Sequence, residues 1–288
     1  MRVFRVFLAA PDYPLDAADK IGYTEREDKK RGGDHAVKDL YAAARRLYDT
    51  CFPGEDPAFT DRLFALAFPA YLEGLSARGE LLSMLFALPY PLFTREGVQE
   101  ARYLYAVATD PRYRGCGYAT TLLSQIAAEG KPVFLRPSSP ALFDFYKKAG
   151  FSPISSYREI SGKAEGAPEG VTALSPDGYL AARDALLSPP YCRMTREFLS
   201  LCFSAAPDMR GAASAAAVGA AGRFAALYER AGDAVHFKEW CGDPSEAPRA
   251  AAFLGAKTFT ARVPDKSGAP FGVGVGIPED AVFLAALD

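Results

Sequence analysis

The chain has 288 residues, 49% of them hydrophobic and 24% charged, which is enough to build buried cores and favours two domains over one. The formal net charge of -2 gives no electrostatic argument for nucleic acid or an anionic membrane as a partner. No stretch approaches the roughly 20 apolar residues that a membrane span requires. We therefore expect a protein with no nucleic-acid or membrane partner.

The cysteine and histidine content argues against a metal centre. The five cysteines form no CxxC pair, and the chain has two histidines, so we expect no bound metal. This cysteine usage is typical of a reducing compartment, and we expect a cytoplasmic protein. The first ten residues, MRVFRVFLAA, are interrupted by Arg5 and predict a strand rather than a signal peptide.

In chain order, a strand and a polar, charged segment occupy residues 1–33. Asp34 is expected to cap an amphipathic helix that ends before Pro53-Gly54. The spacing of apolar residues and turn residues then predicts, in order, a helix over 57–68, strands over 70–75 and 81–88, a strand over 103–108, a helix from 118 to about 129, a strand over 133–136, a helix over 140–148 and extended chain over 151–160.

The segment from Ser161 to Gly170 is rich in Gly, Ala and charged residues and is expected to separate two domains, 34–160 and 171–288. The second half is predicted to hold helices over 177–187, 195–202 and 246–254 and strands over 215–220, 223–230, 234–240 and 257–263. The alternate glycines of residues 271–278 indicate a twisted strand or a tight loop. This order repeats that of the first half, without its glycine loop.

The stretch RYLYAVATDPRYRGCGYATTLL, residues 102–123, is the centre of the functional argument. Strand, glycine loop and helix follow one another, a geometry that presents backbone N–H groups to a phosphate at a helix N-terminus. A P-loop requires Lys-Ser/Thr after its last glycine, but Gly117 is followed by Tyr118-Ala119. A dinucleotide fingerprint requires an acidic residue at the end of the next strand, where this chain has Arg136-Pro137. Both of those nucleotide classes are excluded.

The pattern Arg114-x-x-Gly117-x-Ala119 resembles the acetyl-CoA signature Q/R-x-x-G-x-G/A of the GNAT N-acetyltransferase superfamily. The run LFDFYKKAGF, residues 142–151, resembles the superfamily's second hallmark and lies about 30 residues further on. The resemblance spans residues 34–160. It implies an α/β GNAT acyl-CoA N-acyltransferase fold with a mixed sheet, followed by a smaller GNAT-like C-terminal domain.

The resemblance also implies roles for individual residues. The strand would bind the thioester arm through its backbone, with the N–H of Val107 polarising the carbonyl, and the loop and two arginines would hold the pyrophosphate. The expected acetyl-CoA-binding residues are Ala106, Val107, Ala108, Arg112, Arg114, Gly115, Cys116, Gly117, Tyr118 and Ala119. Tyr146 would be the general acid that protonates the departing sulfur, since a phenol keeps its proton at neutral pH. For Tyr103 and Tyr105, core packing and lining of the active cleft both stay open.

The general base is left open among Glu73, Glu80, Glu100 and the carboxylates of Asp288. The last of these follows from a resemblance to tandem-GNAT proteins of the enhanced intracellular survival family, whose C-terminus enters the active cleft. The expected reaction is direct attack of an amine on acetyl-CoA in a ternary complex. The acceptor is a small-molecule or protein amine, and a homodimer is considered. The alternatives are a non-catalytic acyl-CoA-binding regulatory module and a transferase that uses a longer acyl-CoA.

Overall fold

The computed structural model describes residues 2–5, 33–77, 80–205 and 217–285. The chain forms two compact units: residues up to Leu88 together with Leu104–Gln125, and Pro89–Tyr103 together with Ile126 onward. Most of the polar segment expected between residues 11 and 33 lies outside the described residues.

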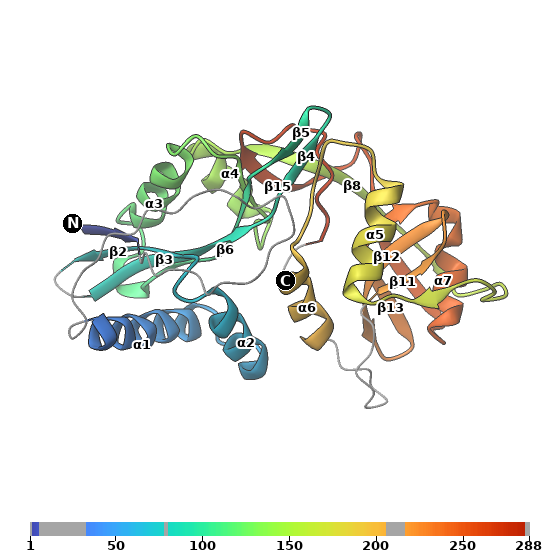
Figure 1. The fold of residues 1–288 in the computed structure, drawn as a ribbon, viewed down its shortest axis with the longest axis horizontal. Helices are drawn as coiled ribbons and strands as arrows, with labels where there is room; N and C mark the ends of the chain where they lie inside the picture. The colour runs from blue at the N-terminus through green and yellow to red at the C-terminus, as the bar shows by residue number, and fades with distance from the viewer. Residues whose placement is uncertain (1, 6–32, 78–79, 206–216, 286–288) are drawn as a thin grey trace. The chain divides into compact units, whose positions relative to one another are not determined.

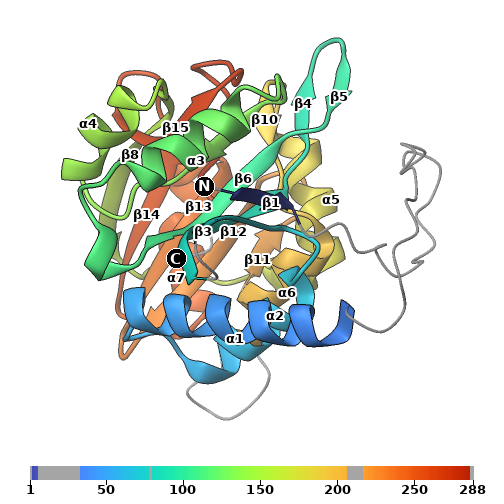
Figure 2. The same ribbon diagram turned by 90° about the vertical axis from the view of Figure 1, so that its left-hand side faces the viewer.

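The first unit is a small antiparallel sheet with helices on both faces. Its strands are β1 (Arg2–Arg5), β2 (Leu72–Ala77) and β3 (Glu80–Pro89), with β2 pairing to both neighbours. Helices α1 (Gly33–Cys51) and α2 (Pro57–Ala67) cover one face, and α3 (Tyr118–Ala127) lies on the other (Figures 1 and 2). Tyr48, Phe64 and Phe86 are fully buried between α1, α2 and β3. Because α1 already begins at Gly33, Asp34 lies within its first turn rather than at the cap.

Strand β6 (Arg102–Thr109) starts in the second unit and continues into the first. At its start, Arg102 and Tyr103 pair in parallel with β7 (Val133–Leu135). At its end, the buried Ser83 on β3 donates a hydrogen bond from Oγ to the carbonyl of Ala108 at 2.8 Å. The predicted strand 103–108 and helix 118–129 are therefore confirmed to within two residues at each end.

The second unit holds a long mixed sheet. Its strand order is β7, β15 (Ala269–Val275), β8 (Ser152–Lys163), β14 (Thr258–Pro264), β13 (Ala234–Gly242), β12 (Phe224–Ala231), β11 (Ala217–Ala220) and β9 (Thr172–Ala173). A separate small sheet joins β10 (Tyr191–Cys192), β4 (Leu92–Thr94) and β5 (Gly97–Gln99). Helices α4 (Ala141–Lys148), α5 (Pro176–Leu186), α6 (Arg196–Ala205) and α7 (Ala247–Phe253) complete this unit. Its α/β class with a mixed sheet is the predicted one.

The glycine-alternating stretch forms β15, which pairs antiparallel with β7 on one side and β8 on the other. A Cβ added to Gly272 would lie 2.8 Å from the carbonyl oxygen of Leu135, so the close approach of β7 requires glycine there. Strand β8 also continues to Lys163, which pairs with Thr258. Residues 161–163 are thus strand, not the linker that their composition suggested, because β14 supplies hydrogen-bond partners that composition does not reveal.

Two polar clusters are buried in the second unit. Arg183 on α5 donates to Glu239 on β13 at 2.8 and 3.0 Å, and Tyr179 also donates to Glu239. Burial by itself would raise the pKa of Glu239, but the charge and hydrogen bonds of Arg183 outweigh it and lower that pKa. The chain near its end is held by Ser155, whose Oγ donates to the carbonyl of Phe283 at 2.6 Å and accepts from its N–H at 2.8 Å. Residues 239 and 155 therefore belong to the packing of this unit.

In the described part of the chain, no helix has the length and apolar character to cross a membrane.

Candidate active site

Strand β6 has a backbone irregularity just before Val107. Ala106 in β6 has φ 54°, a left-handed conformation that is unusual for a residue with a Cβ and rare inside a strand. Such strain persists only where surrounding structure enforces it and is concentrated at functional sites. The turn in backbone direction falls immediately before Val107, the residue expected to polarise a thioester carbonyl. No pattern in the sequence predicts this strain.

The end of β6 is held firmly in the first unit. Ser83 bonds the Ala108 carbonyl and lies 3.1 Å from the Thr109 hydroxyl, and the N–H of Asp110 donates to Leu82 at 3.0 Å. These bonds anchor the strand on β3 just before the glycine loop. Ser83 was not among the predicted residues, because only tertiary contact reveals that its hydroxyl serves a neighbouring strand.

The loop itself turns at its two glycines. Asp110 caps the short helix of Pro111–Tyr113 by accepting from the N–H of Arg112 at 2.9 Å. Gly115 and Gly117 have φ 79° and 81°, and a Cβ added to either would meet no atom within 4 Å. Helix α3 begins at Tyr118, directly after Gly117. The space in front of both glycines and the N–H groups of the first helical turn fit a diphosphate group.

The two arginines expected at the phosphates contact the protein instead. Arg112 is 63% exposed at its side chain and binds Asp110 at 2.8 Å and Glu80 at 3.5 Å. The hydrogen bond from Arg112 lowers the pKa of the Asp110 carboxyl. Arg114 donates to the carbonyl of Thr109 at 3.3 Å and to the sulfur of Cys51 at 3.6 Å. Contact with a phosphate would require either side chain to exchange these partners.

Tyr146 lies in the last turn of α4, in the second unit, and is 6% exposed. Burial raises the pKa of its phenol to about 12, so the hydroxyl remains protonated throughout the physiological range. The ring packs edge-on against Phe145 and Phe151, and the Phe151 N–H donates to the Tyr146 carbonyl at 3.0 Å. The Gly150-Phe151 part of the motif thus fixes the orientation of the turn that carries the phenol.

Tyr103, at the start of β6, belongs to the aromatic core of the second unit. Its ring lies 4.9 Å from that of Tyr90 and 5.4 Å from that of Phe283. Burial raises the pKa of Tyr103, and the nearby positive charge of Arg136 opposes part of this shift. Tyr105 differs, since its hydroxyl lies 3.5 Å from that of the buried Tyr48 in the first unit. Core packing is thus the role of Tyr103, whereas both possibilities stay open for the half-buried Tyr105.

The candidate bases have unequal surroundings. Glu80 accepts from the Tyr113 hydroxyl at 2.8 Å, and Glu100 pairs with Lys131 at 2.8 Å. Glu73 is half-buried on β2. Asp288 lies outside the described residues.

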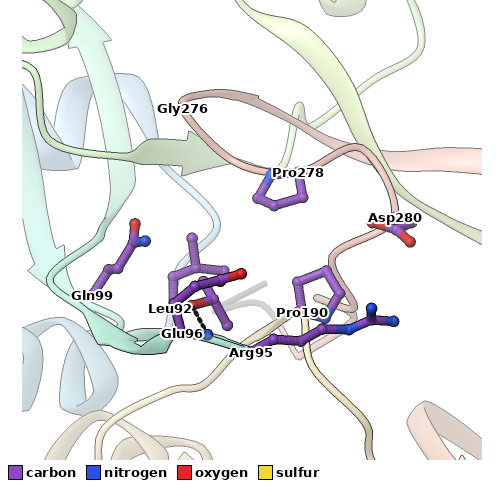
Figure 3. A pocket seen from close by; sticks show the side chains of 9 residues that line it. Leu92, Arg95, Glu96, Gln99, Pro190, Gly276, Pro278 and Asp280 are labelled. Atoms are coloured by element: carbon purple, nitrogen blue, oxygen red, sulfur yellow. Dashed lines mark hydrogen bonds between the residues drawn. The ribbon is translucent and has the colours of Figure 1, made fainter.

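A separate pocket in the second unit, beside the β4–β5 hairpin (Figure 3), contains none of the predicted site residues. Its lining is Leu92, Thr94, Arg95, Glu96, Gln99, Pro190, Gly276, Pro278 and Asp280.

The glycine loop that opens a helix and the protonated phenol further along the chain are the two features on which the resemblance to an acyl-CoA-dependent acyltransferase is based. Comparison with known proteins gives the same class: residues 34–154 match the model of the acetyltransferase (GNAT) domain. The predicted resemblance to the GNAT superfamily is therefore confirmed for residues 34–154, and this domain supports the predicted acyltransferase activity. Comparison with curated proteins gives no match.

Solved structures share the fold over most of the chain. A probable N-acyltransferase from Enterococcus faecalis V583 aligns with a TM-score of 0.61 at 16% identity, covering 85% of this chain and 71% of its own. A GCN5-related N-acetyltransferase from Kribbella flavida gives 0.59 at 14%, covering 83% and 69%. Eis1 from Mycobacterium abscessus gives 0.56 at 14%, covering 83% and 69%. At these identities the likeness shows the fold, and that fold extends beyond the GNAT domain into the second half.

Proposed function

We propose that the protein transfers the acetyl group of acetyl-CoA to an amine by direct attack in a ternary complex. The observation that carries this proposal is the glycine loop: Gly115 and Gly117, both with positive φ and open space before them, lead directly into α3. The backbone N–H groups of residues 115–119 would bind the CoA diphosphate, which the helix dipole favours.

The remaining residues take part in the chemistry. The backbone around Ala106, Val107 and Ala108 would hold the thioester arm, with the Val107 N–H stabilising negative charge on the carbonyl oxygen. The amine nitrogen attacks the carbonyl carbon and the carbon–sulfur bond breaks. Tyr146 then donates its proton to the sulfur; its raised pKa keeps the phenol protonated before this step. Arg112 and Arg114 would exchange their internal partners for phosphate oxygens.

A base must remove the proton of the attacking amine. The oxygens of Glu80 and Glu100 already accept bonds from Tyr113 and Lys131. The base is proposed to be one of the four candidates, Glu73, Glu80, Glu100 or the carboxylates of Asp288. The acceptor would be a small-molecule or protein amine, and the cytoplasm the site of action.

The proposal is tested by replacing the phenol. Tyr146→Phe should lower kcat for the best amine about 10²–10⁴-fold, the usual contribution of a general acid, and leave the affinity for CoA unchanged. Acetyl transfer would be followed by release of free thiol, and CoA binding by calorimetry. Tyr41→Phe, on the exposed side of α1, is the matched control and should match the unmodified protein.

The outcomes separate the alternatives. Equal turnover by Tyr146→Phe would remove Tyr146 as the acid. CoA binding without acetylation of any amine in a broad panel would favour a regulatory acyl-CoA-binding module. Faster transfer from a longer acyl-CoA would replace acetyl as the donor group.

A further inference from the structure

Strand β3 has one polar side chain in an otherwise apolar buried run. The buried residues of this strand, all of them described by the structure, are 81–88, and Ser83 is the polar member, with 0% exposure. Burying a hydroxyl is unfavourable unless it is hydrogen-bonded, so the partners of Ser83 indicate what the residue does.

The Ser83 hydroxyl donates to the backbone of β6. It has one proton, and the carbonyl oxygen of Ala108, 2.8 Å away, can only accept it. The Thr109 hydroxyl lies 3.1 Å from the same Ser83 oxygen. Since the Ser83 proton is used on Ala108, Thr109 donates to Ser83. The two hydroxyls thus form a short chain of hydrogen bonds that ends on the Ala108 carbonyl.

Other elements of the first unit hold the same segment. The N–H of Asp110 donates to the carbonyl of Leu82 at 3.0 Å. The Cys51 thiol, at the end of α1, donates to the carbonyl of Thr109 at 3.6 Å. Residues 108–110 are therefore held from β3 and from α1, and the bond from Ser83 is the shortest of these contacts.

The bond from Ser83 acts close to the strained residue of β6. Ala106, with φ 54°, lies two positions before the Ala108 carbonyl, and Val107 lies between them. A left-handed residue with a Cβ keeps that conformation only where the surrounding bonds enforce it. Without the Ser83 bond, residues 106–108 could relax toward ordinary strand geometry, which would redirect the Val107 N–H. All of these residues lie in the first unit.

We infer that Ser83 is a positioning residue: its bond to Ala108 maintains the conformation of Ala106 and thereby aims the Val107 N–H at the thioester carbonyl. This inference rests on the proposed function and adds the side chain that sets the direction of the carbonyl-polarising group. Negative charge on the carbonyl oxygen grows during attack by the amine. A redirected N–H therefore slows the reaction more than it weakens binding of the donor.

The test compares two variants of nearly the same shape, Ser83→Thr and Ser83→Val, of which only the first keeps a hydroxyl. Ser83→Val should lower kcat about 10–10²-fold, a part of the 10²–10³-fold contribution of one oxyanion donor. Its KM for acetyl-CoA should change by less than about threefold, because the glycine loop still binds the diphosphate. Ser83→Thr should keep kcat within about threefold of the unmodified protein, since the hydroxyl remains.

A stability control separates positioning from a general loss of stability. Ser175→Ala removes the cap of α5 in the second unit, where the serine accepts from the Gly178 N–H at 3.1 Å. It should lower the melting temperature by about 2–4 °C and leave kcat unchanged. Ser83→Ala adds no atoms and should lower kcat as Ser83→Val does, so it replaces the larger variants if thermal melting shows that they do not fold.

Binding supplies a readout without turnover. With no amine present, calorimetry should show that the unmodified protein and Ser83→Thr bind acetyl-CoA at least about threefold more tightly than CoA, the effect of one hydrogen bond to the acyl carbonyl. Ser83→Val should bind the two equally and keep the affinity for CoA.

Equal kcat in Ser83→Val and Ser83→Thr, or a preference for acetyl-CoA that survives in Ser83→Val, would overturn the inference. A fall in kcat that Ser175→Ala reproduces would overturn it as well. The proposed function fails separately: a protein with the Ser83-dependent preference for acetyl-CoA that acetylates no amine would refute acetyl transfer alone. Acetyl transfer that neither Ser83→Val nor Ser83→Ala slows would refute the inference alone.

Discussion

Gly117 has a backbone conformation that an L-residue adopts only with strain, and no side chain crowds the space before it. The glycine is therefore required by its φ and by the proposed approach of a diphosphate, not by packing within the protein. Gly222, in the turn between β11 and β12, has φ 69° and equally open surroundings. The two positions share the conformational cost of a substitution and differ only in the proposed ligand.

Gly117→Ala should lower the free energy of unfolding by about 1–2 kcal/mol, the cost of a Cβ in the left-handed region. It should also raise the KM for acetyl-CoA about tenfold or more, since the methyl group stands between the backbone and the diphosphate. Gly222→Ala should show the same loss of stability with an unchanged KM. Steady-state kinetics and urea unfolding measure the two effects; an unchanged KM in Gly117→Ala would contradict the diphosphate assignment.

At the scale of elements, the segment near the chain's end is secured by one hydroxyl. Ser155 is 3% exposed and has φ 56°, and it binds both backbone groups of Phe283. Phe283 in turn packs against Phe134 at 4.6 Å and Phe271 at 5.4 Å, rings carried by β7 and β15. Ser155 therefore fixes this segment to strands β7 and β15.

Ser155→Ala should destabilise the protein by about 2–4 kcal/mol, because a buried N–H and a buried carbonyl of Phe283 both lose their partner. The single tryptophan, Trp240, is fully buried and reports the unfolding by its fluorescence in urea. Ser200→Ala, which removes a hydroxyl bound only to its own helix, should change stability by no more than about 0.5 kcal/mol. Similar values for the two variants would show that the Ser155 bonds contribute little.

At the scale of the whole molecule, strands from the second half of the sequence pair with strands from the first half in one sheet. Strand β15, from near the end of the chain, lies between β7 and β8, and β14 covers the other edge of β8. Both edges of β8 and one edge of β7 thus pair with residues between 95 and 142 positions away in the sequence. The division into domains 34–160 and 171–288 stays a prediction, and this topology gives a direct way to examine it.

A fragment of residues 1–170 should fail to fold stably, since removing β14 and β15 exposes both edges of β8 and the inner edge of β7. Circular dichroism, solubility and CoA binding, each compared with the full chain, measure the outcome. A soluble fragment that melts cooperatively and binds CoA would show that the first half is an independent domain.

Local sequence patterns were enough to predict most helices of this protein and its functional class. Helical spacing gave α1, α2, α4 and α5 to within a few residues, because each has one apolar face and clear stop signals such as Gly150. The pair of motifs around Gly117 and Tyr146 indicated the acyltransferase class. Each motif is short, because a few neighbouring residues can supply the N–H groups for a diphosphate or the proton for a departing thiolate.

Only the tertiary structure decided the rest. The strain at Ala106, the bond from Ser83 to β6 and the insertion of β15 depend on partners far away in the sequence, and no local preference encodes which strand a residue will face. The partners of Arg112 have the same origin. Periodicity and motifs predict the helix or strand that a segment forms and which of its faces is apolar. The packing of the folded chain decides which distant residue becomes its hydrogen-bond or contact partner.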